Sequence, residues 1–175
     1  MNYATIKWTD IANGEGVRIS LFVSGCTHRC KNCFNEIAWD FDYGQPFDSA
    51  VQEKILSELG SSFISGLSLL GGEPLEPQNQ LALYPFLREV KSRYPEKKVW
   101  CYTGFVLDEK DGTLTNKAKN TPVTKELIAL IDVLVDGPFV EELKDIRLKF
   151  RGSSNQRIID VPRTKEKGEC VLYME

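Results

Sequence analysis

The stretch VRISLFVSGCTHRCKNCFN, Val17–Asn35, joins a run of apolar residues to a loop that is rich in cysteine. Its first half, Val17–Gly25, is dense in β-branched and aromatic residues, which favour a β-strand. Cys26, Cys30 and Cys33 follow at the spacing C-x3-C-x2-C, and no fourth cysteine lies nearby. The stretch therefore predicts a strand that leads directly into a loop with three thiol ligands.

Three thiolates can bind three irons of a [4Fe-4S] cluster, which leaves the fourth iron without a protein ligand. An open coordination position distinguishes a reactive metal centre from a structural one. Two other interpretations of the loop stay open. His28 would complete a Cys3His zinc site, although the four ligands would then lie closer together than is usual for zinc. Cys101 would complete an electron-carrier cluster, which needs a fourth cysteine.

The composition limits the remaining classes of function. The 175 residues carry a net charge of −3, with acidic and basic residues interleaved, so we expect no nucleic-acid partner. No apolar run approaches the roughly 20 residues of a membrane span, and a signal-peptide core is absent, so we expect a cytoplasmic protein and no membrane partner. The single histidine, His28, argues against a Ser-His or Cys-His hydrolase. Cys101 lies in an apolar run and is expected to be buried.

Helix and strand patterns alternate along the rest of the chain. Strands are expected over Gly66–Gly72, Lys97–Gly104 and Asp132–Gly137, with an edge strand within Gly168–Glu175. Helices are expected over Asp48–Gly60, Leu83–Pro95 and Thr121–Ile131. Asp48 would cap the first helix, Pro85 would lie near the first turn of the second or at a kink, and Thr121 would cap the third with Pro122 in its first position. Asp108–Asn120 is expected to be a polar, mobile excursion.

This alternation predicts an α/β fold with a mostly parallel sheet and right-handed crossovers. The strands are apolar throughout, as expected where both faces of a sheet are covered. Four such units are too few for a closed barrel of eight strands and roughly 250 residues. We therefore expect a partial, open β/α barrel or a twisted open sheet, in a single domain over residues 1–175.

The predicted strands end in sequences that suggest a shared site. The first ends in the cysteine loop, and the others end in GGEP (Gly71–Pro74), YTG (Tyr102–Gly104) and DGP (Asp136–Pro138). Active sites of α/β folds lie at the carboxyl ends of the strands, so we expect these four endings to form one rim. A pair of glycines lets the backbone approach a ligand closely. Glu73 would accept a hydrogen bond from an ammonium group, and Asp136 would bind ribose hydroxyls.

These motifs together resemble the radical S-adenosylmethionine (SAM) superfamily, in which such a cysteine loop follows the first strand and GGEP follows the second. The small size of the chain resembles that of the activating enzymes of glycyl radical enzymes. Five stretches resemble, more narrowly, the family of activating proteins of anaerobic ribonucleoside-triphosphate reductase: Asn13–Asn35, Leu67–Asn79, Tyr102–Phe105, Asp132–Phe139 and Phe150–Ile158. The resemblance therefore spans most of the chain.

The resemblance implies that a reduced [4Fe-4S] cluster, held by Cys26, Cys30 and Cys33, cleaves SAM bound to its open iron. The resulting 5′-deoxyadenosyl radical would take a hydrogen atom from a glycine of the large subunit of anaerobic ribonucleotide reductase. A flavodoxin-like protein or another low-potential donor would supply the electron. The residues implied in SAM binding are Asn32, Cys33, Phe34, Asn35, Gly71, Gly72, Glu73, Thr103 and Asp136. The turn Asn13–Gly16 is implied to line the mouth of the site.

One position departs from the superfamily pattern. Many members place an aromatic residue directly before the third cysteine, whereas this chain has Asn32 there and Phe34 after the cysteine. Stacking on Phe34 or backbone contacts would then serve the adenine. Two alternative functions stay open: a small radical SAM enzyme that acts on a metabolite, of the 7-carboxy-7-deazaguanine synthase type, and a non-catalytic binding module stabilised by zinc or a cluster.

Overall fold

One large sheet organises the molecule in this computed structural model, which describes residues 1–175. Its strand order is β10-β9-β8-β5-β4-β2-β1-β3, with β10 at one edge and β3 at the other. The strands of the sheet are β1 (Asn2–Asp10), β2 (Arg18–Val23), β3 (Gln45–Pro46), β4 (Gly66–Gly71), β5 (Lys98–Tyr102), β8 (Val133–Asp136), β9 (Arg157–Asp160) and β10 (Leu172–Met174). A separate hairpin contains β6 (Leu107–Asp108) and β7 (Thr113–Leu114).

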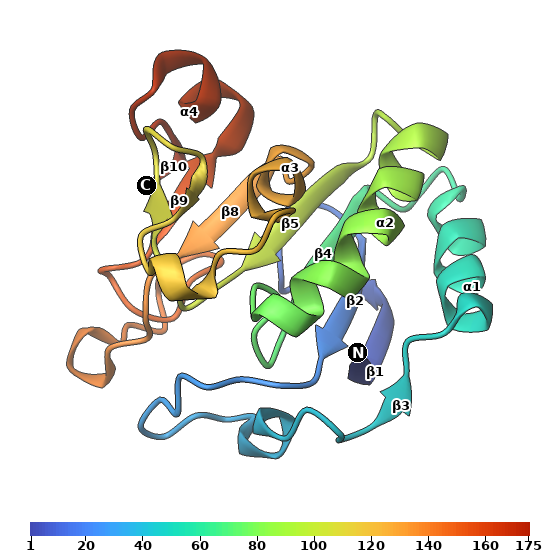
Figure 1. Cartoon of the computed structure of the whole chain (residues 1–175), viewed down its shortest axis with the longest axis horizontal. Coiled ribbons are helices and arrows are strands. Elements are labelled where there is room, and N and C mark those ends of the chain that lie inside the picture. Colours follow the sequence, from blue (N-terminus) through green and yellow to red (C-terminus); the bar gives the residue numbers. More distant parts are fainter.

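All four α-helices contribute buried residues to the main core on one face of the sheet. The helices are α1 (Ser49–Leu59), α2 (Pro77–Arg93), α3 (Thr124–Ala129) and α4 (Val161–Lys167), with short 3-10 helices at Glu36–Trp39, Lys117–Lys119 and Glu141–Leu143. Figure 1 shows α2 and α3 in front of the strands and α1 beside α2. No helix combines the length and the apolar character that crossing a bilayer would require.

The centre of the sheet has the predicted parallel order. β2, β4, β5 and β8 pair in parallel, and the register places Leu21 beside Leu69, Leu69 beside Cys101 and Cys101 beside Leu134. Each of these connections passes through a helix, as parallel pairing requires. The α/β prediction is confirmed. The flanking strands are antiparallel, because β1 pairs with β2, and β9 pairs with β8.

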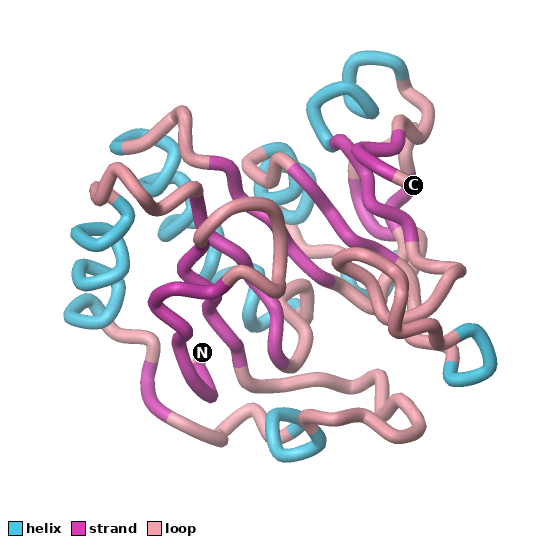
Figure 2. Tube along the Cα trace, turned by 180° about the vertical axis from the view of Figure 1, so that it is seen from behind, coloured by secondary structure: helices cyan, strands magenta, loops and turns pink.

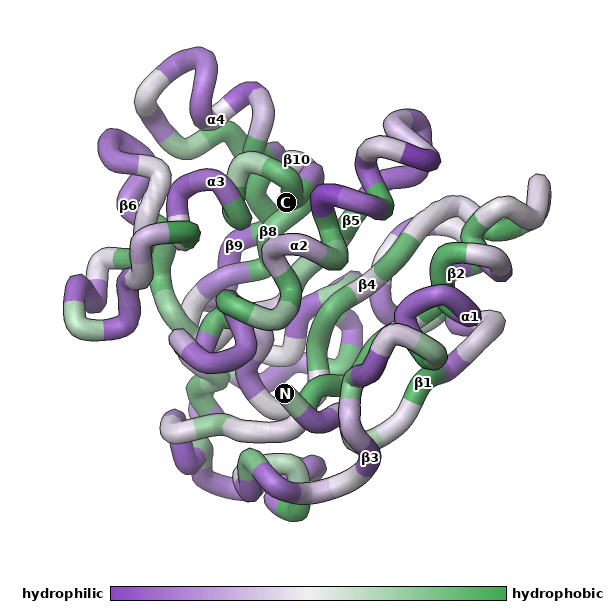
Figure 3. The backbone as a smooth tube through the Cα atoms, turned by 45° about the vertical axis from the view of Figure 1, so that its right-hand side comes forward, coloured by the Kyte–Doolittle hydropathy of each residue, from purple (hydrophilic) through white to green (hydrophobic).

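The two faces of the sheet carry different side chains, because successive residues of a strand point to opposite sides. Leu69 and Cys101 belong to the main hydrophobic core, which also receives the apolar sides of α1, α2 and α3. Cys101 is fully buried there, as its sequence context predicts. Trp100 and Val135 form a smaller apolar cluster on the opposite face. In Figure 2 that face carries loops in place of long helices, and Figure 3 shows hydrophobic stretches along β4 and β8.

The helix starts test the capping predictions. The Asp48 side chain accepts a hydrogen bond from Val51 N at 3.1 Å, so the predicted cap of α1 is confirmed. The prediction for α3 is wrong, because this helix begins at Thr124 and its N-cap residue is Val123. Thr121 Oγ1 accepts from Val123 N at 3.2 Å and so stabilises the turn before the helix.

The helix expected from Leu83 is longer than its sequence pattern suggests. It begins at Pro77, which occupies the first turn, where its missing N–H costs nothing. Pro85 therefore lies inside α2, not near its start. The excursion Asp108–Asn120 contains most of the β6–β7 hairpin and the 3-10 helix Lys117–Lys119, which the sequence did not predict. The final edge strand is confirmed as β10.

Candidate metal centre

The carboxyl ends of β2, β4, β5 and β8 surround a cavity of about 550 Å³ on the face opposite the long helices. This volume is within the usual range for small-molecule sites. The cavity brings together nine of the residues that the sequence marked: Cys26, Cys30, Asn32, Cys33, Phe34, Gly71, Gly72, Glu73 and Thr103. Two more marked residues, Asn35 and Asp136, are not among those that line it. The turn after β1 contributes Ala12 and Asn13, so the implied position of this turn is confirmed in part.

The three cysteines that line the cavity are free thiols. Cys26 is buried, and burial raises its pKa to about 11, although the backbone N–H of His28 acts in the opposite direction. Burial and the neighbouring Cys33 raise the pKa of Cys30, and the backbone N–H of Phe139 opposes them. Without a metal, Cys26 and Cys30 are therefore protonated at neutral pH. Metal binding would displace these protons.

The donor set fits an iron–sulfur cluster better than zinc. Cys33 Sγ accepts a hydrogen bond from Asn35 N at 3.4 Å. Hydrogen bonds of this kind stabilise cluster thiolates. No group of three or more His, Cys, Asp or Glu side chains is arranged to hold a single ion. His28 Nε2 binds Glu73 Oε1 at 2.7 Å and is not directed at the thiols as a fourth ligand would be.

Close approach of backbone atoms requires glycine at the last residue of β4, Gly71, and at the next residue, Gly72. Gly71 has φ +109°, and a Cβ there would lie 2.6 Å from Val23 N. A Cβ on Gly72 would lie 2.6 Å from Gly25 O and 2.8 Å from Ala38 O. From the sequence, this freedom is expected to serve the approach of a ligand. In the structure the glycines first allow close packing, of Gly71 against β2 and of Gly72 against Gly25 and Ala38, and they also line the cavity.

The Glu73 carboxylate is already saturated by donors from the chain. The side chain is 1% exposed, and it accepts hydrogen bonds from Leu75 N at 2.8 Å, Gly104 N at 2.7 Å and His28 Nε2 at 2.7 Å. Thr103 Oγ1 lies 2.9 Å from both carboxylate oxygens. These donors fill the capacity of one carboxylate. Glu73 and Thr103 therefore hold each other at the rim, and a direct contact of Glu73 with an ammonium group stays a prediction.

Comparison with known proteins supports a cluster-binding chain. Residues 12–159 match the family model described as a 4Fe-4S single cluster domain. A protein of Haemophilus influenzae is 43% identical over 160 residues, which cover 90% of this chain and 97% of the relative. A protein of Escherichia coli K12 is 42% identical over 158 residues (89% and 96%), and one of phage T4 is 37% identical over 158 residues (90% and 93%). All three are named anaerobic ribonucleoside-triphosphate reductase-activating protein.

The chain belongs to this family of activating proteins. The match favours a 4Fe-4S cluster over zinc, because the family model describes a 4Fe-4S cluster domain, and the names of the relatives favour the activating-protein function over a non-catalytic binding module. It also favours the activating-protein function over the 7-carboxy-7-deazaguanine synthase type. The family motifs lie where the sequence predicted them, at the carboxyl rim of the sheet.

Asp136 is placed differently from the family-based expectation. Its carboxylate is 1% exposed and binds Arg157, with Nε to Oδ1 at 2.9 Å and Nη2 to Oδ2 at 2.6 Å. Oδ2 also accepts from Leu107 N at 2.8 Å. Asp136 and Arg157 face each other in the β8–β9 register, at the base of the connection Gly137–Gln156. The geometry therefore supports a structural role for Asp136 and does not favour a contact with a ligand.

Asn32 and Asn35 have backbone roles in the cysteine loop. Asn32 has φ +58°, a left-handed conformation that asparagine tolerates better than other residues with side chains. This explains why asparagine suits a position where many superfamily members carry an aromatic residue. Asn35 precedes the 3-10 helix Glu36–Trp39 and donates its N–H to Cys33 Sγ. Phe34, at the cavity, is 92% exposed.

One wall of the cavity was not identified from the sequence. It is formed by the connection between β8 and β9, which contributes residues including Phe139, Lys144, Ile146, Phe150 and Arg151. This segment has no periodic pattern of apolar residues that would predict a helix or strand. Only the resemblance of Phe150–Ile158 to the family drew attention to it. Neither Lys144 nor Arg151 forms an ion pair with a carboxylate of the chain. The wall therefore brings two unpaired positive charges to the cavity.

Proposed function

We propose that this chain is a radical SAM activase that generates a glycyl radical on the large subunit of anaerobic ribonucleotide reductase. The observation that carries the proposal is the gathering of three free cysteines and the GGEP turn on one cavity at the carboxyl rim. The open sheet is consistent with a partial β/α barrel formed by one domain. A rim left open in this way allows a macromolecular substrate to cover the site.

The roles of the cysteines follow from their placement. Cys26, Cys30 and Cys33 would hold a [4Fe-4S] cluster through three of its irons, and the backbone N–H of Asn35 would stabilise the Cys33 thiolate. When bound, the cluster would supply the electron for reductive cleavage of SAM, the chemistry needed to remove a hydrogen atom from the glycine of the reductase. A flavodoxin-like protein or another low-potential donor would reduce the cluster.

The cavity offers complementary groups for SAM as the second cofactor. SAM carries a carboxylate, and Lys144 and Arg151 bring positive charge to the cavity wall. Arg151 Nη1 is held by Gln156 O at 2.6 Å, which fixes the guanidinium in place. The backbone of Gly71 and Gly72 is accessible at the rim for the amino group. Phe34 and the backbone around Asn32 remain the candidates for the adenine.

The first test is anaerobic reconstitution with iron and sulfide, followed by electron paramagnetic resonance of the reduced protein with and without SAM. We expect a reduced-cluster signal that changes when SAM is added, because SAM binds the open iron. Addition of the reductase large subunit should then yield a glycyl radical signal. A protein that takes up zinc but no iron, or a cluster signal that is insensitive to SAM, would contradict the proposal.

The proposal also predicts that Arg151 contributes to SAM binding and that the three cysteines contribute to iron binding. Arg151→Gln should weaken SAM binding by about 10- to 150-fold, since a charge-assisted hydrogen bond contributes roughly 1.5–3 kcal/mol. Iron content should stay at the wild-type value, because Arg151 is not a cluster ligand. Equilibrium titration of the reconstituted protein with SAM measures the affinity. Unchanged affinity in this variant would remove Arg151 from the SAM site without affecting the assignment of the cysteines.

A further inference from the structure

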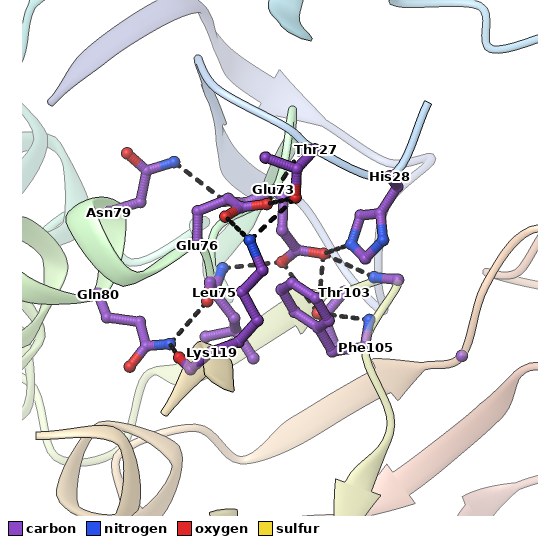
Figure 4. A network of polar contacts seen from close by, with 12 residues as sticks. Thr27, His28, Glu73, Leu75, Glu76, Asn79, Gln80, Thr103, Phe105 and Lys119 are labelled. Carbon is purple, nitrogen blue, oxygen red and sulfur yellow. Dashed lines mark hydrogen bonds and ion pairs between the residues drawn. The ribbon is translucent and has the colours of Figure 1, made fainter. Parts of the chain in front are cut away.

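Two consecutive residues between Cys26 and Cys30 bind two buried carboxylates of the turn after β4. His28 Nε2 donates to Glu73 Oε1 at 2.7 Å. Thr27 donates its backbone N–H to Glu76 Oε1 at 3.0 Å, and its hydroxyl donates to the same oxygen at 2.5 Å. Glu73 is 1% exposed and Glu76 is 2% exposed. Figure 4 shows His28 and Thr27 directed toward these carboxylates.

The position of His28 is fixed by its hydrogen bond to Glu73, by an aromatic neighbour and by close approach to Gly104. Its acceptor cannot turn away, because Leu75 N, Gly104 N and Thr103 hold the Glu73 carboxylate. The ring packs against Phe105, with the ring centroids 4.4 Å apart. A Cβ on Gly104 would lie 2.7 Å from His28 Nε2, so this close approach depends on glycine. The histidine therefore fits a site that the ends of β4 and β5 build for it.

The second contact is reinforced by a residue from the excursion after β5. Lys119 Nζ lies 3.0 Å from Glu76 Oε2 and 3.1 Å from Thr27 Oγ1. Gln80 Nε2 donates to Lys119 O at 2.9 Å and so fixes the backbone of this residue. Burial alone would raise the pKa of Glu76, but the hydrogen bonds from Thr27 and Lys119 lower it overall. Glu76 is therefore ionised at neutral pH and holds Thr27 by charge-assisted bonds.

We infer that His28 is a positioning residue, which with Thr27 fixes the segment between Cys26 and Cys30 so that both thiols are presented to the cluster. This inference rests on the proposed function. A loop that must bring separate thiols into register loses conformational entropy when it binds a cluster. The contacts with Glu73 and Glu76 impose that order before the cluster binds. Groups behind metal ligands commonly change metal affinity by about 10- to 100-fold when they are removed.

The experiment compares His28→Leu with His28→Gln. Leucine removes the donor at similar size, whereas glutamine places an amide N–H near the position of Nε2. Both proteins are reconstituted anaerobically, and the rate of iron loss to a chelator is measured together with the midpoint potential and the spectrum of the reduced cluster. We expect His28→Leu to lose iron about tenfold faster than the wild type with an altered spectrum, and His28→Gln to restore most of the retention.

A matched control separates positioning from general destabilisation. Lys91→Met breaks the ion pair between Lys91 and Asp132, which lies before β8 and away from the cysteine loop. This variant should lower the thermal midpoint and leave the cluster spectrum unchanged. If His28→Leu does not fold, Glu76→Gln, which weakens the contact with Thr27, is measured in its place.

The possible outcomes are distinct. Wild-type protein that binds no iron would contradict the proposed function itself. Wild-type protein that binds iron, with His28→Leu and Glu76→Gln equal to it in retention and spectrum, would overturn only the positioning role. Equal faster loss in His28→Leu and Lys91→Met would also overturn it, because the effect would then follow from stability alone.

Discussion

At the scale of single residues, the roles of some positions in the cysteine loop can be predicted from the sequence and the roles of others cannot. Cys26, Cys30 and Cys33 could be predicted as metal ligands from their spacing, because the spacing of such ligands is encoded locally. The contact between His28 and Glu73 joins residues 45 positions apart, and no local sequence pattern predicts it. From the motif, Glu73 is predicted to accept a hydrogen bond from a ligand. A motif does not show that donors of the chain itself already bind this carboxylate.

Asn32 offers a test of backbone strain in this loop. Its φ of +58° suits asparagine and glycine, whereas a β-branched residue is strained there. Asn32→Gly should leave the stability of the metal-free protein nearly unchanged, and Asn32→Val should lower the free energy of unfolding by about 1–2 kcal/mol. Chemical denaturation measures both. Lys31→Val, at a neighbour outside the left-handed region, is the control, and an equal loss in this control would contradict the explanation.

At the scale of elements, the parallel strands and their crossovers were predictable, and the antiparallel flanks were not. Strand β1 (Asn2–Asp10) alternates between half-buried and exposed positions and contains charged residues, so it lacks the continuous apolar run that identified the central strands. The start of α2 was misplaced for a different reason. Two prolines, Pro77 and Pro85, compete for the role of first-turn residue, and only the packing of the helix shows that Pro77 holds it.

Asp10, at the end of β1, makes the stability of the β1–β2 connection depend on pH. Burial alone would raise the pKa of Asp10, but hydrogen bonds from Asn13, Ser20 and Ala12 N lower it overall. A lowered folded-state pKa stabilises the protein above the unfolded value of about 3.9, and this contribution is lost as pH falls through the folded pKa.

Asp10→Asn should therefore be less stable than the wild type at pH 7 by about 1–2 kcal/mol, with the difference shrinking below pH 4. Urea unfolding of the metal-free proteins between pH 3 and pH 7 measures the difference. A difference that is constant across this range would show that the charge of Asp10 does not contribute.

The pair Asp136–Arg157 predicts a coupling between β8 and β9. Arg157→Met leaves the buried Asp136 carboxylate with Leu107 N as its remaining donor, so we expect a loss of about 3 kcal/mol. The double variant Asp136→Asn with Arg157→Met should recover much of this loss, because asparagine is neutral and still accepts from Leu107 N. Urea denaturation of the single and double variants measures the cycle. Additive losses would show that the two side chains are independent.

At the scale of the whole molecule, the site lies where strand topology alone would place it, at the carboxyl rim of the parallel strands. The fold class and the convergence of the strand ends could therefore be predicted. The wall between β8 and β9 could not, because a long irregular connection has no periodicity and is positioned by tertiary contacts. The position of the cysteine loop in the chain could be predicted from its motif. The contacts of Thr27 and His28 with Glu76 and Glu73, which hold the loop in place, could not.

Cluster loading should stabilise the entire chain, because a ligand that binds the folded state alone raises its stability. We expect anaerobic reconstitution to raise the thermal midpoint by about 5 °C or more, and chelation to reverse the rise. Replacement of all three loop cysteines by serine should abolish the difference between iron-treated and untreated protein. An iron-loaded wild type with an unchanged midpoint would show that the loop binds iron without coupling to the fold.

The ion pair between Asp136 and Arg157 has a wider consequence for the cavity. It joins the two ends of Gly137–Gln156 from within the sheet. This segment supplies the cavity wall that contains Phe139, Lys144 and Arg151. A substitution of Arg157, which does not itself line the cavity, is therefore expected to displace side chains that do, so that ligand binding would respond to a change outside the site.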